Sequence, residues 1–98
     1  MNTPNSRVIA LLKVIDNQVH SFGEGTYIGD LEPPEDIRWY DGQKNPCIKL
    51  DNGKTVWGCE CWWGPAETIK NKYPEPEWEW IEVDINEKRA SWRKEGEL

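Results

Sequence analysis

The chain has 98 residues and a net charge of −6 at pH 7, from 18 acidic and 12 basic side chains. This length suits one domain rather than two, and an acidic surface repels the phosphates of nucleic acids and of anionic membranes. Non-specific nucleic-acid binding and membrane association are therefore not expected, and no apolar run approaches the roughly 18 residues of a membrane-spanning helix. We expect a single domain over residues 1–98, with flexible ends at 1–5 and 95–98.

The N-terminal part of the chain is expected to form a helix followed by short strands. Apolar side chains recur there at the spacing of one helical face, at Val8, Leu11, Leu12 and Ile15. This spacing predicts a helix over residues 7–16, which ends at Asn17. Residues 18–23 then predict a strand, and glycines on both sides delimit a second short strand at Thr26–Ile28. Turn signals in residues 37–46 predict either a short helical turn or a loop there.

The clearest local signal is Asn52-Gly53 between two alternating runs, which is typical of a two-residue hairpin turn. Such a turn pairs Leu50 with Thr55 and Ile48 with Trp57. Alternation then predicts a core face made of Ile48, Leu50, Thr55, Trp57, Cys59, Cys61 and Trp63. The opposite face carries Cys47, Lys49, Asp51, Lys54, Val56, Gly58, Glu60 and Trp62.

The C-terminal part is expected to hold a short helix, a strand and a last helix. Pro65 is suited to the first turn of a helix over residues 65–73. Residues 77–85 alternate as a strand, and Asn86 is the expected cap of a charged helix anchored by Trp92. The predicted fold class is α+β, a small, strongly bent antiparallel β-sheet or SH3-like barrel with an N-terminal helix, a short helix near 65–73 and a C-terminal helix.

The cysteines suggest packing rather than chemistry. Three cysteines are an odd number, which argues against a disulfide framework and favours reduced thiols in a cytoplasm. Cys47, Cys59, Cys61 and His20 are the ligand types of structural zinc, but no C-x2–4-C knuckle is present. The predicted hairpin register also turns Cys47 away from Cys59 and Cys61, so these two are expected to be core thiols.

No other motif predicts catalysis or a cofactor. Gly23 and Gly25 lack the third glycine, the lysine and the following helix of a phosphate-binding loop. His20 is the single histidine, and the sequence has no nucleophile elbow. We therefore expect no enzymatic activity, no cofactor and no metal.

The informative anomaly is the aromatic content, which includes seven tryptophans. Trp62, Trp78 and Trp80 fall on the outer faces of their predicted strands, and Trp39 and Tyr40 fall in the loop. These rings are either a second core under covering helices, or a wall that stacks on a planar ligand. Nearby cations could supply a positive rim for a phosphate, namely Arg38, Lys44, Lys49 and Lys54.

The motif GEGTYIGD…NP-x-I-x-LDNG-x-x-VWGCECWWGP, at residues 23–65, resembles a group of small uncharacterised proteins from bacteriophages and prophages. The resemblance covers under half of the chain and assigns no residue a role. It implies an accessory protein in the cytoplasm of a bacterial host cell. Small phage proteins of this size are often counter-defence factors, which bind an immune effector or sequester a nucleotide immune signal without cleaving it.

The sequence therefore favours a non-enzymatic phage counter-defence protein that sequesters a small nucleotide-type immune signal, with the site formed in a homo-oligomer. The candidate ligand-binding residues are Trp62, Trp78, Trp80, Trp39, Tyr40, Lys49 and Arg38. The alternative is an acidic protein–protein inhibitor of an immune effector. In that case an acidic face mimics nucleic acid and binds a basic partner. The carboxylates of this face belong to Glu75, Glu77, Glu79, Glu82 and Asp84.

Overall fold

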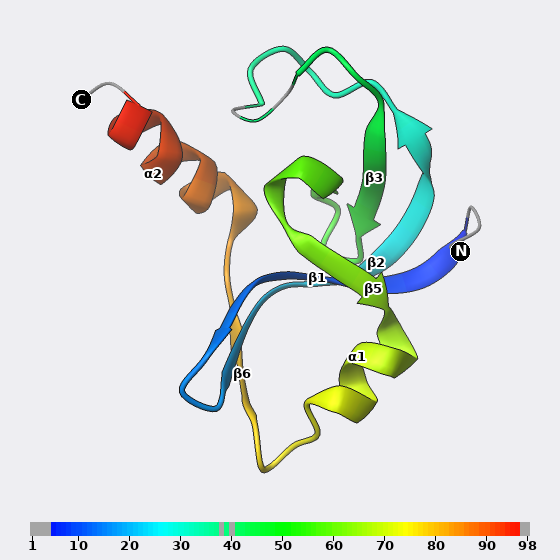
Figure 1. Cartoon of the computed structure of the whole chain (residues 1–98), viewed down its shortest axis with the longest axis vertical. Coiled ribbons are helices and arrows are strands. Elements are labelled where there is room, and N and C mark those ends of the chain that lie inside the picture. Colours follow the sequence, from blue (N-terminus) through cyan, green and yellow to red (C-terminus); the bar gives the residue numbers. More distant parts are fainter. Residues whose placement is uncertain (1–4, 38, 40, 97–98) are drawn as a thin grey trace.

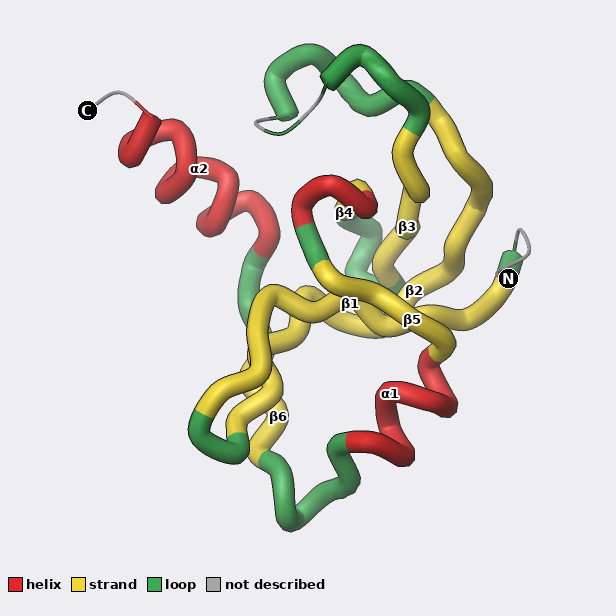
Figure 2. The backbone as a smooth tube through the Cα atoms, viewed as in Figure 1, coloured by secondary structure: helices red, strands yellow, loops and turns green. Residues whose placement is uncertain are grey.

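The structure is a computed structural model that describes residues 5–37, 39 and 41–96. The strands are β1 (Ser6–Ile15), β2 (Gln18–Leu31), β3 (Asn45–Leu50), β4 (Thr55–Trp57), β5 (Trp62–Pro65) and β6 (Glu79–Glu82). A 3-10 turn at Gly58–Glu60 joins β4 to β5, and the helices are α1 (Ala66–Lys72) and α2 (Ile85–Gly96). Figures 1 and 2 show the two helices on different sides of a strongly bent sheet. The predicted flexible ends, 1–5 and 95–98, lie largely outside the described residues.

The sheet has the order β4-β3-β2-β1-β5, and β6 pairs with the first part of β2. Neighbouring strands run antiparallel except for β2 and β6, which are parallel. Within the described residues β4 and β5 do not pair with each other, so the sheet is open. The class is α+β, as predicted. Neither of the described helices has the length and apolar content needed to cross a membrane.

The predicted N-terminal helix is wrong, because residues 7–16 form most of β1 and its turn. Four consecutive side chains from Val8 to Leu11 are buried, since β1 is covered on both faces. Val8 and Ala10 belong to the main core, whereas Ile9 and Leu11 belong to a second cluster on the opposite face. A strand buried on both sides loses its alternation, and its apolar run then imitates a helical face.

A tight turn at Asp16-Asn17 connects β1 to β2. Both residues have positive φ, at 51° and 59°, the conformation of a type I′ hairpin turn, which Asp and Asn tolerate better than most residues. Asn17 therefore reverses the chain instead of ending a helix. The strands predicted at 18–23 and Thr26–Ile28 join into one long β2, which bends at Gly23, where φ is 122° and the register with β1 shifts.

The β3–β4 hairpin exists, but its register differs by one residue from the prediction. Ile48 faces Val56, and Cys47 faces Trp57. The turn is longer than two residues, because the Leu50 amide donates to the Lys54 carbonyl at 2.8 Å. A one-residue slip exchanges the faces of a strand, so Val56 lies in the main core. Trp57 is buried instead with Ile37, Cys47 and Cys59 in a third cluster.

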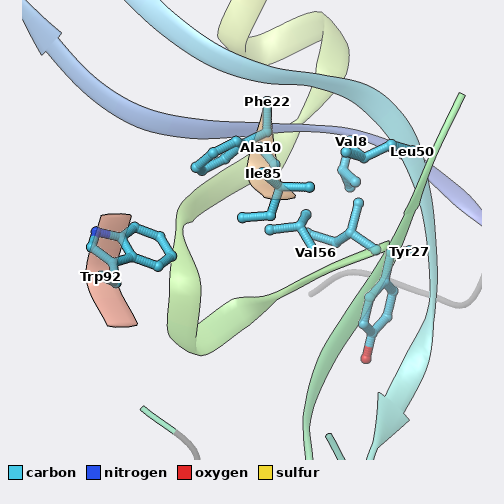
Figure 3. Close-up of a cluster of buried hydrophobic side chains, with 9 residues drawn as sticks. Val8, Ala10, Phe22, Tyr27, Leu50, Val56, Ile85 and Trp92 are labelled. Atoms are coloured by element: carbon cyan, nitrogen blue, oxygen red, sulfur yellow. The ribbon is translucent and has the colours of Figure 1, made fainter. Parts of the chain in front are cut away.

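The main core lies between the sheet and α2 (Figure 3). Its buried members come from β1, β2, β3, β4 and α2: Val8, Ala10, Phe22, Tyr27, Ile48, Leu50, Val56, Ile85 and Trp92. Helix α1 and the loop after it cover the opposite face of β1 and β2, where Ile9, Leu11, Val19 and Ala66 are buried. The two helices therefore serve opposite faces of the same sheet.

The C-terminal elements occur in the predicted order, but the strand is shorter and the cap of the last helix is a different residue. Helix α1 begins directly after Pro65, and the predicted strand is reduced to β6 at Glu79–Glu82. The cap of α2 is Asp84 rather than Asn86: its carboxylate accepts hydrogen bonds from the amides of Asn86 at 2.8 Å and Glu87 at 3.4 Å. Lys54 pairs with the other oxygen of Asp84 at 2.6 Å, which ties the cap to the β3–β4 hairpin.

Candidate functional site

The aromatic side chains singled out in the sequence are distributed unevenly between surface and interior. Trp62 is 76% exposed and Trp39 is 44% exposed. Trp78 and Trp80 are half-buried and pack on the second cluster. Arg38 and Tyr40 lie outside the described residues. Among the described candidates, Trp62 is therefore the ring most available to a ligand.

Trp78 and Trp80 serve largely as cover for the second core face. The Trp80 indole donates to the Tyr73 carbonyl at 2.9 Å. The Trp78 ring meets the Tyr73 ring edge-on, with centroids 4.9 Å apart. These contacts hold the loop after α1 against the sheet. The sequence left open whether these rings form core or wall, and the structure gives them a largely packing role.

Trp62 stands beside a groove of about 490 Å³, called here the Trp62 groove. The residues that line it come from β1, β5, α1 and the residue after α1: Leu11, Lys13, Val14, Trp62, Trp63, Ile69, Lys72 and Tyr73. This volume falls within the roughly 300–1,000 Å³ typical of small-molecule sites. The groove therefore combines an exposed indole, apolar walls and two ammonium groups.

Strand pairing and helix packing fix the positions of these side chains. Leu11 on β1 faces Trp62 on β5, so the indole projects at the edge where β1 continues to Lys13. Lys72 lies in the last turn of α1, which follows β5 directly. Gly64 on β5 lies against Ile69 of α1, since a Cβ at Gly64 would be 3.4 Å from the Ile69 side chain, an ordinary van der Waals distance. Strands β1 and β5 and helix α1 thus converge on one groove.

The two lysines of the groove differ from the five cations of the described residues that form ion pairs. Arg7, Lys54, Lys70, Arg89 and Arg93 each lie within 4.0 Å of a carboxylate. Lys13 and Lys72 are exposed, and within the described part of the chain neither forms an ion pair. The Lys72 ammonium lies 5.6 Å from the Tyr73 ring centroid, which orients it over an aromatic face. The groove thus offers two positive charges that no neighbouring acid neutralises.

A second hollow of about 520 Å³ lies on the other side of Trp62 and is called here the indole cleft. It is lined by Leu12, Trp39, Gly58, Cys59, Glu60, Cys61, Trp62 and Trp92. Trp39 meets Trp92 edge-on, with centroids 4.5 Å apart. The charged residue in this cleft is Glu60, whose carboxylate is held by Arg89. The indole cleft therefore suits apolar matter better than an anion.

The thiols of the cleft are poor nucleophiles and poor metal ligands at neutral pH. Burial raises the pKa of Cys61 to about 12, and it also raises the pKa values of Cys59 and Cys47. Cys47 shares the third cluster with Cys59, so the predicted separation of those two is wrong. Across the described residues no group of three or more ligating side chains is placed to hold a metal ion.

Of the residues that line the groove, sequence reasoning named Trp62 alone as a ligand-binding candidate, and it missed the two lysines and the tyrosine, Lys13, Lys72 and Tyr73. Lys13 was hidden by the predicted helix, since only a strand places it beside Leu11. Lys72 and Tyr73 belong to a correctly predicted helix end, but its approach to β1 and β5 is a tertiary feature. Lys49, which was expected at the rim, is exposed on β3 and lines neither the Trp62 groove nor the indole cleft.

Comparisons with known proteins do not assign the chain to a family. No family model matches it, and searches of curated proteins and of solved structures gave no significant match.

Proposed function

We propose that this protein is a non-enzymatic binding protein that holds a small nucleotide in the Trp62 groove. The observation that carries the proposal is the combination of an indole exposed to 76% with two lysines that lack acidic partners among the described residues. A base stacks on an indole, and an ammonium group attracts a phosphate. The groove supplies both groups within one concave surface.

Sequestration is the activity that follows from such a site. The groups that line the Trp62 groove bind by stacking, apolar contact and charge, and its two walls belong to a firmly packed sheet and helix. We propose that the protein has the role that the sequence resemblance implies, a phage accessory protein that removes a nucleotide-type immune signal in the cytoplasm of a bacterial host. For the fold class we propose an SH3-like barrel that is left open between β4 and β5, and the strand order and the 3-10 turn between these two strands support it. We also propose that the protein forms a homo-oligomer, and analytical ultracentrifugation measures its mass in solution to test this.

Calorimetric and thermal-shift titrations test the binding claim. The probes are 5′-AMP, ADP-ribose and cyclic dinucleotides, with tryptophan fluorescence as a second readout. We expect at least one probe to bind, and Trp62→Ala to weaken its binding about ten- to hundredfold, because a stacked base contributes roughly 1–3 kcal/mol. Trp39→Ala removes another exposed indole and should leave the affinity unchanged. Absence of binding by every probe at high micromolar concentration would contradict the proposal.

The alternative is the acidic inhibitor, and one feature of the structure favours it. Four exposed carboxylates lie in the segment before β6 and in β6 itself, which is an edge strand. They belong to Glu75, Glu77, Glu79 and Glu82. Asp84, the fifth predicted member, instead caps α2 and pairs with Lys54. If no nucleotide binds, charge reversal of Glu77 and Glu79 becomes the next experiment, because it should abolish capture of a basic effector.

A further inference from the structure

The Trp62 groove also adjoins a third hollow, distinct from the indole cleft, and Tyr73 lines both the groove and this hollow. This third hollow, called here the Ser21 pocket, has a volume of about 400 Å³. It is lined by Ile9, Ser21, Gly23, Glu24, Lys70, Tyr73, Glu75 and Trp80. Tyr73 follows the last residue of α1, so the groove and the pocket lie on either side of the end of that helix.

The Ser21 pocket repeats the composition of the Trp62 groove in one respect, since it too has an aromatic wall next to a lysine. Trp80 provides the indole, and its Nε1 is fixed on the Tyr73 carbonyl at 2.9 Å. Lys70 provides the ammonium, two residues before Lys72 on α1. The aromatic residues Trp62, Tyr73 and Trp80 and the lysines Lys13, Lys72 and Lys70 are thus distributed over two adjoining hollows.

The polar groups of the Ser21 pocket differ from those of the groove. Ser21 is buried, and its hydroxyl donates to the Ala10 carbonyl at 3.3 Å while accepting from the Gly23 amide at 2.9 Å. Glu24 pairs with Lys70 at 2.8 Å and with Arg7 at 3.0 Å, and these partners hold its pKa below the ordinary value. Glu75 is exposed at the rim and can accept hydrogen bonds from the amino group of a base.

From this arrangement we propose that the ligand is a dinucleotide, with one base on Trp62 and the second base in the Ser21 pocket. The phosphates pass the end of α1, where Lys70 lines the pocket and pairs with Glu24, and Lys72, two residues further on, lines the groove. A longer strand is disfavoured, because the exposed carboxylates of Glu77 and Glu79 follow Glu75 along the chain. This inference rests on the proposed function, and it specifies the ligand class of the same site.

Isothermal titration with one-base and two-base probes tests the inference. The probes are 5′-AMP, ADP-ribose, the linear dinucleotide pApA and cyclic di-AMP. At least one dinucleotide should bind about tenfold or more tightly than 5′-AMP, because a second stacked base contributes roughly 1–3 kcal/mol. Lys70→Gln removes the ammonium of the Ser21 pocket and leaves Glu24 with one cation fewer, so it should reduce that advantage while leaving the affinity for 5′-AMP nearly unchanged. The matched control is Lys49→Gln, an exposed lysine on β3 that lines neither hollow.

The possible outcomes separate this inference from the proposed function. Equal affinities for 5′-AMP and for both dinucleotides would overturn the dinucleotide inference and leave the nucleotide site at Trp62 intact. The same conclusion follows if Lys70→Gln weakens 5′-AMP and the dinucleotides by the same factor. If none of the four probes binds, the proposed function fails, and the inference fails with it.

Discussion

At the scale of single residues, the most deeply buried ion pair among the described residues is the one between Glu60 and Arg89. The Glu60 side chain is 1% exposed, and the guanidinium grips both carboxylate oxygens at 2.7 and 2.8 Å. The same carboxylate accepts the Trp57 amide at 3.1 Å, and Arg89 also donates to the Thr55 carbonyl at 2.8 Å. These hydrogen bonds connect α2 to the 3-10 turn and to β4, and they raise the pKa of Arg89.

Glu60→Ala should therefore destabilise the protein strongly. The substitution leaves a half-buried guanidinium and the Trp57 amide without their acceptor. We expect the free energy of unfolding to fall by about 3 kcal/mol, the low end of the range for breaking a buried pair, because water can reach part of Arg89. Urea unfolding followed by circular dichroism measures it. Glu67→Ala, at an exposed position of α1, is the control, and an equal effect of the two substitutions would contradict this account.

At the scale of elements, the strength of the local signal separates what the sequence could predict from what it could not. Helix α1 and the strand before α2 were predictable, because Pro65 and a run of alternating residues mark them locally. The β1 strand was not, because burial on both faces erases its alternation. The hairpin at Asn52-Gly53 was predictable, but its register was not, because it depends on how the turn closes.

The residues of the site likewise separate into those that the sequence could predict and those that only the tertiary structure brings together. The outward position predicted for Trp62 agrees with its exposure, although the 3-10 turn at Gly58–Glu60 breaks the strand on which that prediction was based. Lys13, Lys72 and Tyr73 meet Trp62 only through the pairing of β1 with β5 and the docking of α1. No local pattern carries that information, so the groove required the tertiary structure.

The start of α2 predicts a dependence of stability on pH. The pKa of Asp84 is lowered by its bond to Lys54 and by the amides at the start of the helix. A carboxyl whose folded pKa is lowered stabilises the native state above its ordinary pKa, about 3.9, and that contribution disappears as the pH falls through the folded pKa. Asp84→Ala should thus be less stable than the wild type at pH 7, and the two should converge on acidification.

Thermal unfolding between pH 7 and pH 2.5 measures this convergence. Asp84→Asn is the informative companion, because asparagine caps a helix without a charge. It should retain the hydrogen bonds at the start of α2 but lose the pairing with Lys54, and its deficit should also shrink in acid. A difference between wild type and Asp84→Ala that stays constant over this range would show that the carboxylate charge has no part in stability.

At the scale of the whole molecule, the two helices divide the surface into regions of different character. Helix α2 covers the main core and closes the indole cleft, whereas α1 covers the second core face and forms one wall of the Trp62 groove. The chain is acidic overall, with a net charge of −6. Lys13 and Lys72 form no ion pair within the described part of the chain, so they place two positive charges together at the groove of an acidic protein. A small anion can bind there, while a long polyanion is repelled by the remaining surface.

The most direct test of the account observes the Trp62 indole itself during a nucleotide titration. In ¹⁵N-labelled protein each of the seven tryptophans gives an indole N–H signal, and Trp62→Phe assigns the one that matters. Upon addition of pApA or 5′-AMP, the Trp62 signal should shift most, and the signals of Trp39 and Trp92 in the indole cleft should shift little. A Trp62 signal that stays fixed at millimolar nucleotide, or larger shifts at Trp39 and Trp92, would contradict the assignment of the groove as the nucleotide site.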